Sequence, residues 1–153
     1  MNLEFFEYHT RLAAYVLLTD VVDGQDRVLL AWWNGEGHSD PEWSLPGGGI
    51  DFDESIMDGV VREVVEETGY DVEPGALLVE HHFTARGRSF DGWFRAQRFV
   101  FEATITGGEL GTTEVGGSTD RAEWVPLSEL EGQPRSGIVD IALAARARKV
   151  ASR

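Results

Sequence analysis

The chain has 153 residues, and its 27 acidic residues outnumber its 13 lysines and arginines, which gives a formal net charge of −14. This length fits one domain, expected to span residues 1–153, and the 42% of hydrophobic residues suffice for one core. The negative charge argues against binding to a nucleic-acid polymer or an anionic membrane surface, because both depend on lysine and arginine. The sequence contains no cysteine, which excludes disulfide scaffolds, thiolate nucleophiles and iron–sulfur clusters.

The beginning of the sequence lacks the basic start and the continuous apolar segment of a signal peptide. Its longest apolar run, Leu12–Leu18, is far shorter than the roughly 20 residues that cross a bilayer. We therefore expect a cytoplasmic protein without a membrane segment.

The expected elements are strands before and after one central helix, with a second helix at the end, an order that indicates an α+β fold or an α/β/α sandwich. Runs rich in β-branched and aromatic residues predict a hairpin of two strands, Leu12–Val22 and Arg27–Trp33, around Asp23–Asp26. Later segments predict, in chain order, a helix at 55–69, strands at 76–84 and 93–106, a loop at 107–120, a strand at 122–125, a helical turn at 126–131 and a helix at 136–150. Long loops inside ordered domains are often functional, so the 107–120 loop is a candidate for the site.

The helix at 55–69 has clear start and stop signals. Ser55 with Asp58 three residues later matches a capping box, and Gly69 suits the left-handed residue that ends a helix. At 100° per residue, one face carries Met57 and four valines at 60, 61, 64 and 65, and the valines should face the core.

The opposite face of this helix carries Glu63, Glu66 and Glu67, interrupted only by Arg62. Residues three and four positions apart are neighbours on a helix, so like charges here cost a few tenths of a kcal/mol (about 0.2–0.5) each. A solvated acidic face is the ordinary reading of such a stripe. Alternatively, clustered carboxylates beside the glycines at 47–49, which let backbone carbonyls approach, make a hard-oxygen site for Mg²⁺ or Mn²⁺.

The same residues resemble the Nudix box, G-x5-E-x7-R-E-U-x-E-E-x-G-U, in which U is a bulky aliphatic residue. The matching positions are Gly48, Glu54, Arg62, Glu63, Val64, Glu66, Glu67 and Gly69. Only the last position departs from the pattern, because Tyr70 is aromatic. The flanking segments 43–47 and 123–127 also resemble family sequences.

The resemblance implies a Nudix-type α/β/α sandwich with a mixed sheet, the Nudix helix on one face and a C-terminal helix on the other. It also implies a pyrophosphohydrolase that uses Mg²⁺, with Mn²⁺ as a substitute, to cleave a nucleoside diphosphate linked to another group X. A cation that bridges phosphoryl groups and acidifies a water molecule agrees with that chemistry. The partner implied is a small phosphorylated nucleotide, and family members are often homodimers.

Carried onto this sequence, the resemblance implies a metal-binding set formed by Gly47, Glu54, Glu63, Glu66 and Glu67. Glu63 would be either a ligand or the base that deprotonates water, and Arg62 would hold the carboxylates in place. Many family members take a further catalytic acid from a loop outside the box. Our candidate is Glu114, with Glu109 and Asp120 behind it, although a solvated loop acid fits Glu114 equally well.

Residues that could bind the rest of the substrate lie outside the box. Arginines could meet exposed phosphates and aromatic side chains could stack on a base; the candidates are Arg86, Arg88 and Arg95, and Trp32 and Phe83. Subfamilies specific for ADP-ribose or dinucleoside polyphosphates carry a proline or tyrosine fifteen to eighteen residues after the box, where this chain has residues 85–88, Ala-Arg-Gly-Arg. A nucleoside triphosphate or related small nucleotide is therefore the leading prediction. Hydrolysis of a nucleotide sugar and a non-catalytic nucleotide-binding module are the alternatives.

Overall fold

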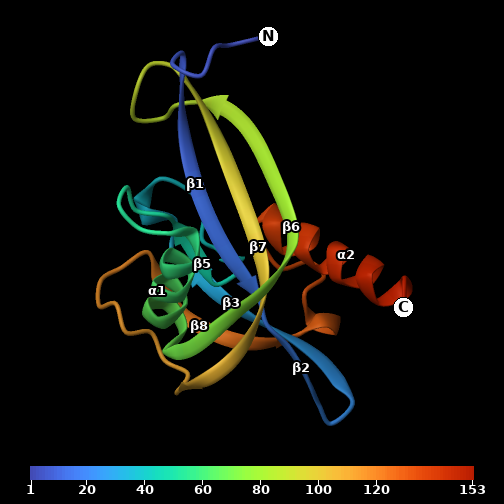
Figure 1. The fold of residues 1–153 in the computed structure, drawn as a ribbon. Helices are drawn as coiled ribbons and strands as arrows, with labels where there is room; N and C mark the ends of the chain where they lie inside the picture. The colour runs from blue at the N-terminus through green and yellow to red at the C-terminus, as the bar shows by residue number, and fades with distance from the viewer.

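The structure is a computed structural model that describes residues 1–153. It contains two four-stranded sheets and two α-helices (Figure 1). The elements in chain order are β1 (Tyr8–Leu17), β2 (Thr19–Val22), β3 (Gln25–Trp33), η1 (Gly35–Gly37), β4 (Glu42–Ser44), β5 (Gly47–Gly49), α1 (Ile56–Thr68), β6 (Tyr70–Arg86), β7 (Trp93–Gly108), β8 (Thr119–Pro126), η2 (Leu127–Glu129) and α2 (Gly137–Ala151).

The first sheet is mixed and has the strand order β5-β1-β7-β6. Its central strands β1 and β7 run parallel, whereas β5 and β6 pair antiparallel with their neighbours. In the second sheet β3 pairs antiparallel with β2, β4 and β8. The predicted mixed sheet is therefore present, and a second antiparallel sheet accompanies it.

The two helices cover different sides of these sheets, as the two buried clusters show. Val60 and Val64 of α1 pack with alternate residues of β1 such as Ala14 and Val16. Ile138, Val139 and Ala142 of α2 pack with the other β1 residues, Ala13, Tyr15 and Leu17. Because successive residues of a strand point to opposite faces, the predicted sandwich of two helices around a sheet is confirmed.

The segment predicted as one strand at 12–22 forms parts of two sheets. β1 pairs with β7 up to Leu17, whereas β2 pairs with β3 from Thr19 onward. The buried Leu18 lies at the crossing, where its carbonyl oxygen accepts a hydrogen bond of 3.0 Å from the N–H of Leu29. Continuous β-propensity in the sequence does not mark this change of partner.

The other strands extend beyond their predicted bounds. β6 begins at Tyr70 rather than at residue 76, because register shifts around Pro74 and Leu77 let the strand continue past the proline. β8 begins at Thr119 rather than at residue 122, which shortens the loop predicted at 107–120 to residues 109–118. Toward the N-terminal end of β1, the strands β1, β6 and β7 project beyond α1 (Figure 1).

The predicted boundaries of α1 are confirmed. Ser55 Oγ accepts a hydrogen bond of 3.0 Å from the N–H of Asp58, and Gly69 ends the helix at φ 76°. On the face predicted to pack against the core, Val60 and Val64 are buried and Val61 and Val65 are half-buried, whereas Met57 is exposed. Neither helix of the protein has the length and apolar composition that crossing a bilayer requires.

Gly69→Ala tests how the end of α1 is built. A Cβ at this left-handed position would overlap the carbonyl oxygens of Glu109 and Gly111, so we expect the substitution to lower the free energy of unfolding by about 1–3 kcal/mol. Gly24→Ala is the matched control, since Gly24 has the same φ of 76° but nothing near its Cβ position. Urea denaturation of both variants measures the difference, and equal losses would show that the contact with the loop contributes nothing.

Candidate active site

The last turn of α1 holds the loop at 109–118 against the helix. The N–H of Gly111 donates to the carbonyl of Thr68 at 2.8 Å, and the N–H groups of Thr113 and Glu114 donate to the carbonyl of Glu66 at 2.9 and 3.3 Å. Carbonyls at the end of a helix have no partner within it, so the loop satisfies groups that would otherwise need water. These bonds place Glu114 beside the acidic face of α1.

Arg62 is the centre of the acidic face. Its guanidinium donates to Glu54 at 2.6 and 3.1 Å, to Glu63 at 3.1 Å and to Glu66 at 3.3 Å. A further bond of 3.1 Å reaches the carbonyl of Gly49 in β5. Hydrogen bonding to Arg62, together with the backbone N–H of Asp51, lowers the pKa of Glu54 to about 2. Arg62 therefore positions the carboxylates.

Glu67 is buried on the inner side of the acidic face, with 9% of its surface exposed. Its carboxylate accepts hydrogen bonds from the N–H of Gly47 at 2.9 Å and from the hydroxyl of Thr119 at 2.8 Å. Its pKa is raised to about 8, mainly by burial and also by the charges of Glu63 and Glu114, whereas the two hydrogen bonds oppose the shift. The side chain thus ties α1 to both β5 and β8.

Glu63 lies against the glycines of β5. A Cβ on Gly48 would be only 2.8 Å from the Glu63 carboxylate, so the glycine permits this close approach. Burial raises the pKa of Glu63, the bond to Arg62 lowers it, and the charges of Glu66 and Glu114 raise it. A cation close to this carboxylate would therefore be stabilising.

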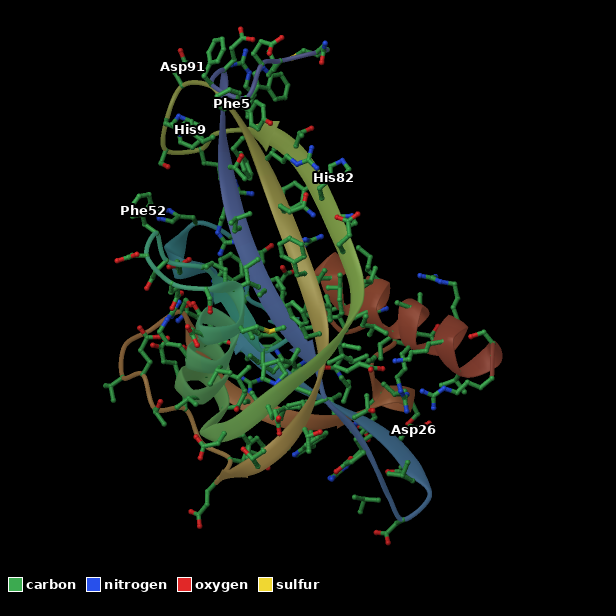
Figure 2. The ribbon with its side chains drawn as sticks, in the orientation of Figure 1. Phe5, His9, Asp26, Phe52, His82 and Asp91 are labelled. Carbon is green, nitrogen blue, oxygen red and sulfur yellow. The ribbon has the colours of Figure 1, made fainter.

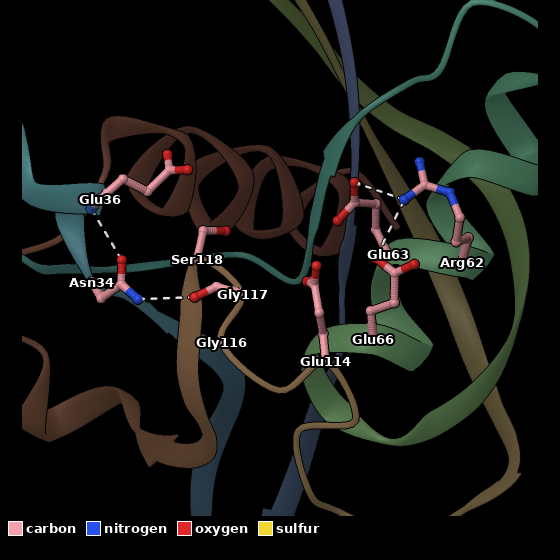
Figure 3. A pocket seen from close by; sticks show the side chains of 9 residues that line it. All are labelled: Asn34, Glu36, Arg62, Glu63, Glu66, Glu114, Gly116, Gly117 and Ser118. Carbon is pink, nitrogen blue, oxygen red and sulfur yellow. Dashed lines mark hydrogen bonds and ion pairs between the residues drawn. The ribbon is translucent and has the colours of Figure 1, made fainter.

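A cavity of about 650 Å³ opens beside these groups, and we call it the acidic cavity (Figure 3). No hydrophobic side chain lines it; the residues that do are Asn34, Glu36, Arg62, Glu63, Glu66, Glu114, Gly116, Gly117 and Ser118. Asn34 holds the far wall, since its Nδ2 donates to the carbonyl of Gly117 at 3.0 Å and its Oδ1 accepts from the N–H of Glu36 at 3.0 Å. Figure 3 shows the carboxylates of Glu63, Glu66 and Glu114 on one side of the cavity.

The donor set of the acidic cavity fits a hard divalent cation. Carboxylate oxygens are the ligands that Mg²⁺ prefers, and Arg62 is the only basic residue among those lining the cavity. No three acidic, histidine or cysteine side chains are already arranged to hold an ion. Because Mg²⁺ usually keeps several waters and shares ligands with substrate phosphates, a few carboxylates suffice to bind it.

The predicted site residues fall into two groups. Glu63, Glu66, Arg62 and Glu114 line the acidic cavity, and Gly47, Glu54 and Glu67 bond to them or to their neighbours. The predicted substrate residues do not line it. Instead, they contact other parts of the surface, where Arg86 pairs with Asp91, Arg88 bonds Ser39, Arg95 bonds Gln97, Trp32 lies under Arg121 and Phe83 lies under Arg98.

Asn34, Glu36 and Ser118 were not predicted as cavity residues. Asn34 precedes a glycine, and Asn-Gly signals a turn, which is the only local signal in this part of the sequence. Nothing in the sequence indicates that the turn lies across from α1, because the contact joins Asn34 to a loop 83 residues away.

Comparison with known proteins finds similarity over most of the chain. The model of the NUDIX domain matches residues 9–145. Human 8-oxo-dGDP phosphatase NUDT18 is 37% identical over 117 residues, which are 76% of this chain and 33% of the human protein. The chain spans about a third of the length of the curated relatives it matches first.

Solved structures share the fold. The MutT NUDIX hydrolase from Burkholderia pseudomallei is 26% identical with a TM-score of 0.66, and the match covers 90% of this chain and 98% of that one. The MutT protein from Methanosarcina mazei Go1 is 23% identical with a TM-score of 0.67, covering 94% of this chain and 97% of that one.

The raised pKa of Glu67 predicts a pH-dependent stability in the absence of divalent cations. Between about 4.5, the ordinary pKa, and about 8, the folded chain binds more protons at Glu67 than the unfolded chain does. This stabilisation is complete below pH 4.5 and is lost as the pH rises to 8. Glu54 has the opposite shift, so its contribution changes only below its ordinary value of 4.5.

Glu67→Gln removes the titrating group and keeps its shape. As the pH rises from about 5 to about 8, the free energy of unfolding of the natural chain should fall. In Glu67→Gln the fall should be smaller, because the variant has no group at this position to lose a proton. Urea denaturation with a chelator measures both, and Glu131→Gln, an exposed acid in no ion pair, is the control. The same pH dependence in the natural chain and in Glu67→Gln would contradict the assignment.

Proposed function

The chain belongs to the Nudix family of pyrophosphohydrolases, and from that premise we propose that it hydrolyses a phosphoanhydride bond of a small nucleotide with the help of a divalent cation. The observation that carries the proposal is that Glu63 and Glu66, held by Arg62, converge with Glu114 on one cavity without apolar walls. Such a cavity suits phosphate oxygens and hydrated cations and offers no surface to an apolar ligand.

The residues that would hold the cation are Glu63, Glu66, Glu67 and Glu114, with Glu54 and the backbone of Gly47 beside them. The cation would neutralise phosphoryl charge and make an attacking water molecule more acidic. In the reaction the water oxygen forms a bond to phosphorus, the bridging P–O bond breaks, and the leaving phosphate keeps the electron pair. Glu63 or Glu114, whichever of the two does not bind the cation, accepts the proton of the water molecule.

Glu63 suits the role of base because burial raises its pKa, which strengthens it as a proton acceptor. Arg62 takes no proton. Its bonds keep Glu54, Glu63 and Glu66 in place while the charge on the substrate changes. Catalysis of this kind depends on positioning and electrostatics and needs no covalent enzyme intermediate.

Among substrates, we propose nucleoside triphosphates and diphosphates. The human relative is named for 8-oxo-dGDP, which makes oxidised guanine nucleotides the first group to test. ADP-ribose and dinucleoside polyphosphates rank lower because the chain lacks the proline or tyrosine expected after the box. We also keep, as predictions, Mn²⁺ as a substitute for Mg²⁺, a cytoplasmic location, a homodimer, and no binding to nucleic-acid polymers or membranes.

We expect Mg²⁺ to stabilise the fold. A ligand at about 100 times its dissociation constant adds about 2.7 kcal/mol to the free energy of unfolding. Differential scanning fluorimetry with increasing MgCl₂ measures the rise in melting temperature, and KCl at equal ionic strength is the control. The double variant Glu66→Gln/Glu114→Gln should lose most of the rise. A melting temperature that does not change with the Mg²⁺ concentration would count against a cation site.

Glu66→Gln tests the catalytic role of the acidic cavity. We expect kcat to fall about 100-fold or more while the protein stays folded, because the side chain keeps its size but loses its charge. Release of phosphate and pyrophosphate from 8-oxo-dGDP, 8-oxo-dGTP, ordinary nucleotides and nucleotide sugars with Mg²⁺ gives the measurement. Glu131→Gln should keep the natural rate. Nucleotide binding without any hydrolysis would favour the binding-module alternative.

A further inference from the structure

A second cavity, of about 600 Å³, lies beside the acidic cavity and shares Glu63 with it. We call it the edge cavity, because it borders the part of β1 that extends past β5. On that side β5 pairs only with Ala13–Tyr15 of β1, so no strand covers Thr10 and Arg11. Its volume falls in the range of small-ligand cavities, about 300–1,000 Å³.

The lining of the edge cavity differs from that of the acidic cavity. Its walls include four apolar side chains, Leu12, Ile50, Phe52 and Ile56, whereas the acidic cavity has none. A nucleotide has a polar phosphate chain and a flat, largely apolar base, and these two parts need different surroundings. Of the two neighbouring cavities, only the edge cavity offers apolar contact.

Phe52 stands out among these walls. It lies in the loop between β5 and α1, and its side chain is fully exposed and points away from the body of the protein (Figure 2). A large aromatic ring without a packing partner at the rim of a cavity contributes nothing to the core. It is available to stack on the base of a ligand.

Arg11 is the one basic residue of the edge cavity, and it has no acidic partner. Three acids also line the cavity, yet Asp51, Glu54 and Glu63 all pair with Arg62. Arg11 takes part in none of the ion pairs of the chain. In a protein with a net charge of −14, an unpaired guanidinium in a cavity is free to bind an anion.

The position of Arg11 links it to the acidic cavity. Its guanidinium lies 3.5 Å from the Cβ position of Gly49, and the neighbouring Gly48 is in close contact with the Glu63 carboxylate. A substrate that reaches across Glu63 would therefore have phosphates near the cation-binding carboxylates at one end and Arg11 at the other. The glycines at 48 and 49 leave the path between them free of side chains.

We propose that Arg11 binds the phosphate adjoining the nucleoside and that the edge cavity receives the nucleoside, with Phe52 against the base. This inference rests on the proposed function, since it assumes a phosphorylated nucleotide at Glu63. It assigns substrate binding to Arg11 of β1 and Phe52 of the loop between β5 and α1, in place of Trp32 of β3 and the arginines and Phe83 of β6, β7 and the turn between them.

Two matched probes test the two parts of the proposal. One is guanosine 5′-(α,β-methylene)diphosphate, whose P–C–P linkage resists hydrolysis, and the other is methylenediphosphonate, which lacks the nucleoside. Calorimetric titration with Mg²⁺ measures the binding of both. Arg11→Ala should weaken both probes about tenfold, because a charge-assisted hydrogen bond is lost. Phe52→Ala should weaken only the nucleotide probe, about fivefold.

Arg148→Ala is the control for removal of a charge, because Arg148 is exposed on α2, forms no ion pair and lines neither cavity. It should bind both probes as the natural chain does. Arg11→Lys should recover part of the affinity for both probes. Melting temperatures close to that of the natural chain are expected for all variants, since Arg11 and Phe52 are exposed.

The outcomes separate this inference from the proposed function. If the natural chain hydrolyses nucleotides but Arg11→Ala binds both probes normally, the inference alone fails. If the natural chain hydrolyses no nucleotide but binds both probes, and the Arg11→Ala variant binds them more weakly, the hydrolase proposal fails and the proposed binding site stands. A natural chain that neither binds the probes nor hydrolyses nucleotides would overturn both.

Discussion

The site depends on one guanidinium that holds several carboxylates of like charge. Glu63 and Glu66 would repel each other on a bare helix face, and Glu54 belongs to the loop between β5 and α1. Arg62 bonds all three, and its bond to the carbonyl of Gly49 fixes α1 against β5 as well. The bonds order the carboxylates and leave the net charge of the cluster negative, as the proposed cation site requires.

Segments that precede and follow α1 in the sequence hold the other two acids, Glu67 and Glu114, in place. Glu114 comes from a loop far along the sequence, and it reaches the site because the carbonyl of Glu66 accepts the backbone N–H groups of that loop. Hydrogen bonds from Gly47 and Thr119, which belong to different sheets, fix the carboxylate of Glu67. The acidic cavity is therefore supported by both sheets, and its geometry follows from regular elements rather than from loops alone.

Features set by local sequence could be predicted, and features set by pairing between distant segments could not. The ends of α1 were predictable because Ser55 and Gly69 act within one turn of the helix. The spacing of the glutamates placed Glu63 and Glu66 on one face for the same reason. In contrast, the transfer of the chain from β1 to β2 at Leu18 depends on which strand lies beside each half. Arg11 could not be predicted, because a single arginine in a strand forms no pattern.

The negative charge around α1 should make nucleotide binding depend on a divalent cation. Residues 51–73 contain nine acidic residues and one arginine, and Arg62 is already committed to the carboxylates around it. A nucleotide that approaches without a cation meets net repulsion, which the single charge of Arg11 cannot offset. A divalent cation bound there would change the sign of the local field at the point where the proposed phosphates lie. Affinity for the nucleotide should therefore depend on the cation, whereas the apolar walls around Phe52 contribute the same contact in either case.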